Sequence, residues 1–302
     1  MRISRIRKDL HWPTDEADPR MAMTSANERR YVEWYAANLY RGEGAMVELG
    51  CWLGSLTRAV CRGLKHNRRL QQPVRVEVYD RFQWDTVMES WVAGTPIAGR
   101  LKDGGDYEAM YREQVEEYLP MLSIHHADLT TERWNGGPIE FLLVDAMKAM
   151  CTARGICRSF YPSLLPECGY LAHQDFLHFF HGWIHVTTYL LRDSFEWTYE
   201  VPHSDMVVFR CVRPVAEREF PQTMNGFSTE EVAAAFDWAE QHVSPGKRDT
   251  IAAARAMAHL HRGETETGKR LVESALAGEH SNSAAFQQLK EFTTRFDLVH
   301  WG

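Results

Sequence analysis

The sequence Val47-Glu-Leu-Gly-Cys-Trp-Leu-Gly-Ser55 connects a short apolar run, residues 45–49, to a helical pattern over residues 55–64. Gly50 would let the chain turn tightly and let a ligand approach the backbone, and Gly54 would let the helix pack closely on the strand. The G-x-G-x-x-G spacing of a dinucleotide site, where a helix N-terminus meets a pyrophosphate, does not occur in this turn. Glu48 suits a cationic ligand and would repel a pyrophosphate. The segment therefore predicts a loop that binds a cation, the alternative being a tight turn in an ordinary α/β protein.

The alternation of strand and helix continues on the C-terminal side of this turn. Further strand-like runs cover residues 74–79, 122–127, 139–144 and 169–172, and two more, 195–201 and 206–212, are separated only by a short turn. Five alternating units followed by a hairpin predict a mainly parallel sheet with helices on both faces. Four of the five strands end in an acidic residue, at the carboxyl edge where open α/β sheets bind their ligands.

Composition limits the classes of function. The 302 residues suffice for one large α/β domain with a small appendage, and the apolar fraction of 44% predicts a sizeable buried core. A net charge of −7 argues against broad binding to nucleic acid, which needs a basic surface. No apolar run approaches the roughly 18 residues of a membrane span. No apolar run follows the basic residues 1–8, so they do not resemble a signal peptide, and the six cysteines form no C-x-x-C pair. We expect a cytoplasmic protein with reduced thiols.

The domain organisation follows from the same patterns. Residues 1–44 are expected to form a helical lead-in, whose helix over 24–40 would begin with a capping box of Ser25 and Glu28. Residues 45–215 form the α/β domain. Residues 216–302 contain only helical patterns, a pair of which vaguely resembles one tetratricopeptide unit, and we expect them to cap the main domain or to contact a second copy of the chain.

Within the α/β domain, residues 81–120 make a connection longer than usual between the second and third strands. The segment is rich in aromatic residues and begins beside an acid at a strand end. It is expected to be a lid over the acceptor molecule of the reaction that this edge would carry out. The alternative is an insertion that serves dimerisation.

The E-L-G-x-x-x-G form resembles the first motif of class I S-adenosylmethionine-dependent methyltransferases, and the resemblance extends over about residues 24–214. It implies a Rossmann-like, mostly parallel sheet of seven strands with an antiparallel last strand, followed here by a C-terminal helical appendage. It also implies S-adenosylmethionine as the cofactor. In that family the glycine loop lies along the methionine part of the cofactor, which carries an ammonium and a sulfonium.

The resemblance places cofactor contacts at the strand ends: Glu48, Gly50, Gly54, Asp80, Phe82, Asp128, Leu129 and Asp145. Asp80 matches the acid that accepts hydrogen bonds from both ribose hydroxyls, and Phe82 would cover the adenine. Asp128 matches the residue that contacts the adenine amino group, with Leu129 beside the ring. An acid in the position of Asp128 is also a common helix cap.

Asp145 and Asp175 fall at the ends of the fourth and fifth strands, where the metal-dependent branch of the family holds a divalent ion with carboxylates. A magnesium ion there would lower the pKa of a substrate hydroxyl and orient it. This sequence departs from that branch, because Met147 and Lys148 stand where a further acid often occurs and Gln174 replaces a paired acid. The metal ligands Asp145 and Asp175 are therefore one of two alternatives.

The other alternative needs no metal, since positioning and a base suffice for methyl transfer. His173, or Asp175 through a water, would then deprotonate an acceptor hydroxyl. His173 can equally be a strand-end histidine satisfied by a backbone hydrogen bond. His178, His181 and His185 have a helical spacing that zinc sites use, although helix surface or pocket lining is the favoured interpretation.

The catalytic candidates are thus His173, Asp175 and Asp145, and the expected reaction is methyl transfer to a small molecule. Resemblance to the macrocin O-methyltransferase and cephalosporin hydroxylase type suggests a hydroxyl of a sugar or secondary metabolite. No N-P-P-Y-type motif follows the fourth strand, which mildly favours oxygen over nitrogen. A nicotinamide-dependent oxidoreductase and a catalytically silent cofactor-binding scaffold stay open. We expect no nucleic-acid or membrane partner, and a homodimer is compatible with the sequence.

Overall fold

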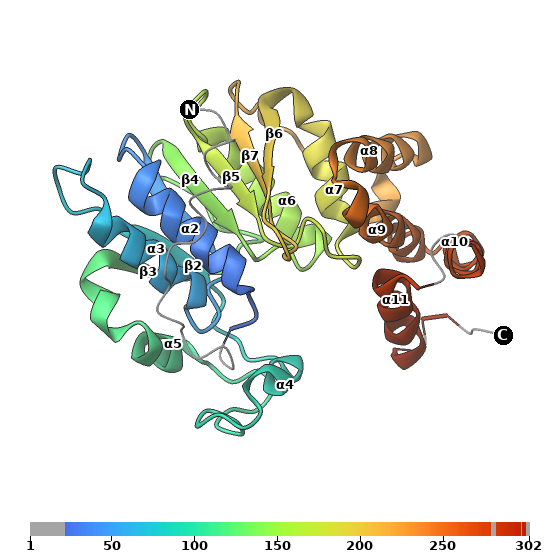
Figure 1. Ribbon diagram of the computed structural model, residues 1–302, viewed down its shortest axis with the longest axis horizontal. Coiled ribbons are helices and arrows are strands. Elements are labelled where there is room, and N and C mark those ends of the chain that lie inside the picture. Colours follow the sequence, from blue (N-terminus) through green and yellow to red (C-terminus); the bar gives the residue numbers. More distant parts are fainter. Residues whose placement is uncertain (1–21, 279–281, 297, 300–302) are drawn as a thin grey trace.

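The computed structural model describes residues 22–278, 282–296, 298 and 299, so the first part of the expected lead-in, residues 1–21, lies outside the described residues. Seven strands form one sheet in the order β3-β2-β1-β4-β5-β7-β6 (Figure 1). The strands are β1 (Ala45–Leu49), β2 (Val76–Asp80), β3 (Leu122–His126), β4 (Ile139–Val144), β5 (Tyr170–His173), β6 (Phe195–Glu200) and β7 (Val207–Cys211).

Strands β1 to β5 pair in parallel, whereas β7 runs antiparallel to both of its neighbours, β5 and β6. All seven expected strands are present, and their bounds differ from the expected ones by at most two residues. The chain therefore has the class I methyltransferase fold that the resemblance implied, with the antiparallel last strand inserted beside β5.

The central strand β4 shows why these segments form a covered sheet. All six of its residues are buried, and alternate side chains point to opposite faces. Leu142 and Val144 pack with helices α6 (Met150–Ser159) and α7 (Gly182–Leu190). Phe141 and Leu143 pack on the other face, with the helices that precede β3.

Three helices cover that second face: α2 (Ala26–Asn38), α3 (Ser55–His66) and α5 (Glu108–Gln114). Helix α2 begins with the expected capping box, because the Ser25 hydroxyl accepts from the Glu28 N–H at 3.2 Å and the Ser25 N–H donates to the Glu28 carboxylate. The two layers of helices leave the carboxyl ends of β1, β2, β4 and β5 at one edge of the sheet.

The segment between β2 and β3 contains two parts. Its first part carries η3 (Thr86–Met88) and α4 (Glu89–Val92) on a loop that we call the tip, residues 84–105. The tip closes on itself, since Trp84 N–H donates to Gly105 O at 2.7 Å and Gly104 N–H donates to Trp84 O at 2.8 Å. It projects from the body of the molecule (Figure 1), and its side chains Val87 and Trp91 are 62% and 51% exposed. The second part, α5 and η4 (Glu116–Met121), packs against the sheet layer.

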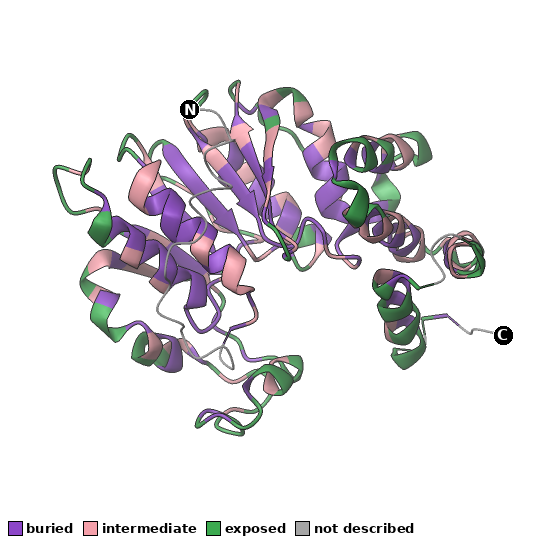
Figure 2. Ribbon diagram, viewed as in Figure 1, coloured by how far each residue is buried: buried purple, intermediate pink, exposed green. Residues whose placement is uncertain are grey.

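Four helices follow β7: α8 (Thr229–His242), α9 (Arg248–His261), α10 (Thr265–Ala277) and α11 (Ala284–Arg295). Helix α8 joins the core through α7, and α9 to α11 share a smaller apolar cluster with Phe179. Figure 2 shows that burial is concentrated in the sheet and its covering helices, whereas α10 and α11 present largely exposed faces. Every helix in the described part of the chain is too short or too polar to cross a lipid bilayer.

Candidate active site

The turn after β1 requires its first glycine. Gly50 has a φ of +84°, in the left-handed region, and a Cβ there would lie 2.8 Å from the carbonyl oxygen of Asp145. Gly54 has a φ of +78° and begins α3, but the atoms nearest to its missing side chain belong to Val115 and Tyr111. Gly54 therefore makes room for the segment between β2 and β3, and not for the contact between helix and strand that the sequence suggested.

Asp80, at the end of β2, is the acceptor that organises this loop. Its Oδ2 accepts the N–H groups of Cys51 and Trp52, at 2.9 and 3.2 Å. Its Oδ1 accepts the Phe82 N–H and the Tyr107 hydroxyl, both at 2.8 Å. Four donors thus converge on one carboxylate, which has about four acceptor positions. The loop amides that a pyrophosphate would need are already bound to a negative charge.

Two residues held by Asp80 adopt a backbone conformation that is uncommon for bulky side chains. Trp52 has a φ of +43° and Phe82 a φ of +49°. Such conformations cost of order 1 kcal/mol or more and occur where surrounding interactions hold them. Here the hydrogen bonds from both backbone N–H groups to Asp80 provide that restraint, so this carboxylate shapes the loops on both sides of it.

Glu48 lies beneath the glycine loop with 1% of its surface exposed. The Thr57 hydroxyl donates to its Oε2 at 2.7 Å, whereas its Oε1 is buried and has no hydrogen-bond partner. Burial raises the pKa of Glu48 to about 8, and the Thr57 hydrogen bond only partly offsets this. A buried carboxyl with one unsatisfied oxygen fits an approaching ammonium, which would favour its charged form.

Three residues expected to contact adenine lie in different surroundings. Phe82 is fully buried and packs against Tyr107 and Tyr111. Asp128 is exposed, and its Oδ1 accepts the Thr130 N–H at 2.9 Å, which lowers the pKa of this carboxyl. Leu129 is buried in the core on the α6 side of the sheet. Asp128 thus caps its own turn, as the alternative interpretation required, and the cofactor roles of these residues stay predictions.

Asp145 and Asp175 do come together, and Lys148 lies between them. The Lys148 ammonium is 2.7 Å from Asp145 Oδ1 and also forms an ion pair with Asp175 Oδ2. With its amide nitrogen turned toward the carboxylates, Gln174 donates to Asp175 Oδ1 at 2.7 Å and to Asp145 Oδ1 at 3.1 Å. Both carboxylates thus share one ammonium and are hydrogen-bonded by Gln174, all from the chain itself.

This arrangement does not support the expected magnesium site with ligands Asp145 and Asp175. A lysine ammonium sits where the ion would have to bind, and Met147 and Gln174 supply no charge in place of the missing acids. Among the residues that the structure describes, no three histidine, cysteine or acidic side chains form a group that could hold a metal ion. The residues present therefore do not fit a magnesium ion.

The charges of this cluster influence one another. Burial raises the pKa of Asp145 and Lys148 only partly offsets the effect, whereas at Asp175 the effect of burial is outweighed by Lys148 and by His181, which together lower the pKa. For Lys148 burial is likewise outweighed by the two carboxylates, and its pKa is raised. At neutral pH the lysine therefore carries its charge, and Asp145 is the better proton acceptor of the two acids.

His173 is 1% exposed, and its Nε2 is 3.0 Å from the Tyr161 hydroxyl. Burial lowers its pKa to about 3. This is the strand-end histidine of the alternative interpretation, although its partner is a side chain. Its role as base stays a prediction.

The remaining histidines do not share one helix face. His178 and His181 precede α7, which begins at Gly182, and only His185 lies within that helix. His185 is completely buried between Phe176 and Phe236, with ring centroids 4.7 and 5.0 Å away. His178 and His181 lie close together, with ring centroids 4.9 Å apart, but His185 is buried elsewhere, so the three do not share the face that suggested zinc.

Two residues that take part in the hydrogen bonds and ion pairs of this edge were not identified from the sequence. Lys148 was noted only as a departure from the metal-dependent pattern, although a cation three residues after a strand-end acid is itself a signal for an ion pair. Tyr107 lies 27 residues after Asp80, and no local pattern predicts that its hydroxyl returns to that carboxylate.

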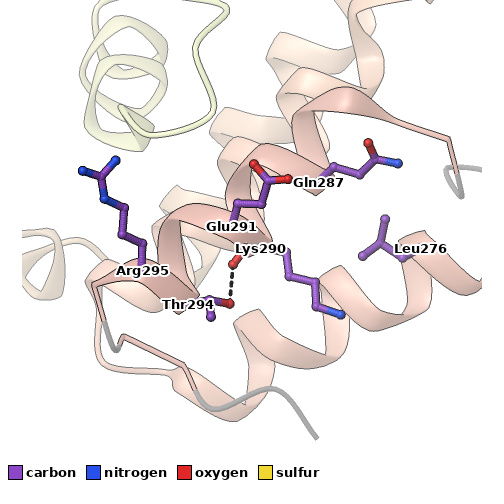
Figure 3. Close-up of a pocket in the computed structure, with 6 residues that line it drawn as sticks. All are labelled: Leu276, Gln287, Lys290, Glu291, Thr294 and Arg295. Atoms are coloured by element: carbon purple, nitrogen blue, oxygen red, sulfur yellow. Dashed lines mark hydrogen bonds between the residues drawn. The ribbon is translucent and has the colours of Figure 1, made fainter. Parts of the chain in front are cut away.

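Two surface hollows lie elsewhere on the molecule. One, of about 380 Å³, is lined by residues around 64–74 together with Met121. The other, of about 430 Å³, lies between α10 and α11 (Figure 3) and is lined by Leu276, Gln287, Lys290, Glu291, Thr294 and Arg295. Neither is lined by a residue of the carboxyl edge discussed above.

No family model matches the chain, and no curated protein sequence matches it. The structure of the O-methyltransferase NovP is 14% identical, and the alignment covers 69% of this chain and 88% of that one with a TM-score of 0.48. The apo structure of CalS11, a TDP-rhamnose 3'-O-methyltransferase of calicheamicin biosynthesis, is 11% identical, with coverages of 69% and 92% and a TM-score of 0.48. A coclaurine N-methyltransferase bound to N-methylheliamine and SAH is 14% identical, with coverages of 92% and 82% and a TM-score of 0.34. Likenesses of this size carry no argument for activity, and the fold is assigned from the strand order and directions given above.

Proposed function

We propose that this chain, which has the class I methyltransferase fold, transfers a methyl group from S-adenosylmethionine to a small molecule, with a hydroxyl of a sugar or secondary metabolite as the acceptor. The observation that carries the proposal is the electrostatic character of the carboxyl edge. Asp80 binds the amides of the glycine loop, and Glu48 lies buried beneath it with Oε1 unsatisfied. Such an edge repels phosphates and attracts a cation. This favours a sulfonium and ammonium ligand over a nicotinamide dinucleotide.

The residues that would hold the cofactor are Glu48, toward the ammonium, and Asp80, toward the ribose hydroxyls. When bound, the cofactor supplies an electrophilic methyl group on a sulfonium. The orphaned oxygen of Glu48 gives the ammonium a buried acceptor, and binding would lower the raised pKa of this carboxyl.

Asp145 is the residue that we assign as the base. Its side chain is 18% exposed whereas that of Asp175 is 10% exposed, and burial raises the pKa of Asp145, which favours proton uptake. Asp145 would hold the acceptor hydroxyl and take its proton onto a carboxylate oxygen, which would make the acceptor oxygen nucleophilic toward the methyl group that the bound cofactor would supply.

Calorimetry tests the cofactor assignment directly. S-adenosylmethionine and S-adenosylhomocysteine should each bind with one site per chain, and NAD⁺ and NADP⁺ should not bind. Thermal unfolding gives an independent check, because a ligand present at 100 times its Kd stabilises a protein by about 2.7 kcal/mol. The proposal would be overturned if a nicotinamide dinucleotide binds and neither S-adenosylmethionine nor S-adenosylhomocysteine does.

The reaction is tested next, with isotopically labelled S-adenosylmethionine and a panel of hydroxylated sugars and aromatic metabolites. A labelled ether product supports the proposal, and a labelled amine would correct the acceptor from oxygen to nitrogen. Cofactor binding without any transfer, combined with loss of a protein complex when residues 216–302 are removed, would support the scaffold alternative instead.

A further inference from the structure

We propose that Lys148 is an internal cation that replaces a divalent metal ion at this edge and positions the acceptor oxygen for transfer. The positioning role rests on the proposed function, whereas the replacement of the metal does not. Asp145 and Asp175 stand at the two strand ends where a divalent ion would be expected, but in this structure both are paired with Lys148. The inference comes from this difference.

The geometry of the cluster leaves the lysine facing outward. The Lys148 side chain is 53% exposed, whereas those of Asp145 and Asp175 are 18% and 10% exposed. An ammonium has three N–H donors, and two of them are directed to these carboxylates. The third donor is therefore available on the exposed side, where an acceptor oxygen would approach.

The backbone holds Lys148 in this position. Asp145 N–H donates to Leu49 O and Lys148 N–H donates to Ala146 O, both at 2.8 Å. The indole N–H of Trp183 donates to Met147 O, also at 2.8 Å, and ties the turn to α7. A tight turn between β4 and α6 thus brings residues three apart in sequence into contact, which makes the ion pair a fixed part of the fold.

The charges favour the lysine over a second cation. Two carboxylates and one ammonium leave a net charge of −1 on the cluster, which is compatible with a cationic methyl donor nearby. A divalent ion placed between the same carboxylates would lie next to the ammonium and be repelled by it. Gln174 and Met147 add no charge that would compensate for this repulsion.

Titration with Mn²⁺ followed by electron paramagnetic resonance tests the replacement without any activity measurement. The wild-type protein should show no stoichiometric site. Lys148→Ala should gain one site at least tenfold tighter than any wild-type binding, and Asp175→Asn added to that variant should abolish it. Lys148→Arg, which keeps a cation, and Lys247→Ala, which removes a lysine paired with neighbouring Asp205, should gain nothing.

Two results would overturn the replacement of the metal. One is a stoichiometric Mn²⁺ site in the wild-type protein that Asp175→Asn removes, and the other is a correctly folded Lys148→Ala variant without the gained site. Circular dichroism of each variant establishes folding, and Lys148→Met, which is also uncharged, repeats the comparison if Lys148→Ala unfolds.

Kinetics test the positioning role separately. Lys148→Ala should lower kcat at least hundredfold with less than a fivefold change in the KM of the cofactor, and Lys148→Arg should recover at least a tenth of the wild-type kcat.

Chelator treatment should leave wild-type activity unchanged. If chelation abolishes transfer, or if Lys148→Ala keeps full kcat, the positioning role is wrong while the methyltransferase proposal stands. If neither S-adenosylmethionine nor S-adenosylhomocysteine binds, the proposed function fails. The Mn²⁺ titration then still decides whether Lys148 replaces a metal ion.

Discussion

The hydroxyl of Tyr107 donates to Asp80 Oδ1 at 2.8 Å, at the carboxylate to which the resemblance assigns the ribose hydroxyls. Burial and the neighbouring carboxylate raise the pKa of Tyr107, so this hydroxyl stays protonated and remains a donor. The second part of the segment between β2 and β3 thereby supplies the donor that a bound cofactor would have to displace.

The first prediction concerns this competition. Tyr107→Phe should tighten binding of S-adenosylhomocysteine about tenfold or more, since a hydrogen bond to a charged group contributes about 1.5–3 kcal/mol. Calorimetry measures the change. Tyr40→Phe is a matched control, because it removes the Tyr40 hydrogen bond to Gly44 O far from the site. Weaker binding by Tyr107→Phe would mean that the hydroxyl contacts the cofactor and does not compete with it.

The second prediction concerns Asp80 itself. Asp80→Ala should weaken cofactor binding at least tenfold and lower the free energy of unfolding by about 2–4 kcal/mol, because four donors lose a charged acceptor. Denaturant unfolding and calorimetry give the two values. Asp128→Ala, which removes an exposed carboxylate with one amide donor, should cost less than about 1 kcal/mol. Equal effects of the two substitutions would contradict the organising role of Asp80.

The third prediction concerns pH. The folded protein holds the Glu48 proton more tightly than the unfolded chain, because burial raises its pKa to about 8. Its contribution to stability therefore becomes less favourable as the pH rises from about 4.5 toward 8. A cationic ligand prefers the ionised carboxylate, so affinity for S-adenosylhomocysteine should rise with pH and level off above about 8.

Glu48→Gln separates this effect from titration of the ligand. The variant should bind more weakly at pH 8.5, and its affinity should depend less on pH than that of the wild type. Calorimetry from pH 6 to 9 measures both curves. Superimposable curves would rule out Glu48 as the partner of the ammonium.

The fourth prediction concerns acid stability. Burial lowers the pKa of His185 to about 3, and the backbone groups of His181 and Phe176 only partly offset this effect. The unfolded chain takes up this proton near pH 6.5, so the stability supplied by the neutral ring is lost as the pH falls below that value. His185→Phe should therefore raise Tm at pH 5 relative to wild type by more than it does at pH 8. An equal effect of His185→Phe on Tm at the two pH values would refute this origin.

Much of the fold could be predicted because the decisive signals are local. Five of the six residues of β4 are apolar, Glu140 being the exception, and such a run is typical of a strand covered on both faces; Gly50 and Asp80 mark the ends of β1 and β2. The burial of Phe82 could not be predicted from its position beside Asp80, since it depends on α5 packing against it from 25 or more residues later.

The chemistry of the site was less accessible from the sequence for the same reason. Asp145 and Asp175 were expected to lie together, but what neutralises them depends on the turn that directs Lys148 back toward both. His173 was placed correctly at a strand end, while its partner Tyr161 comes from a different segment. Residue type and strand position predict which groups meet, and the conformation of the connecting turns determines how they are paired.

The closed base of the tip has a consequence for how this protein can diversify. The chain leaves at Trp84 and returns at Gly104 and Gly105, where two backbone hydrogen bonds close the base of the tip, and the side chain of Arg100 adds an ion pair to Glu113 of α5. The length and composition of the tip can change by exchange or duplication at a small entropic cost, because loop closure depends only weakly on length. Related chains could thus acquire new specificities at the tip, while Asp80 and the sheet beneath it keep their geometry.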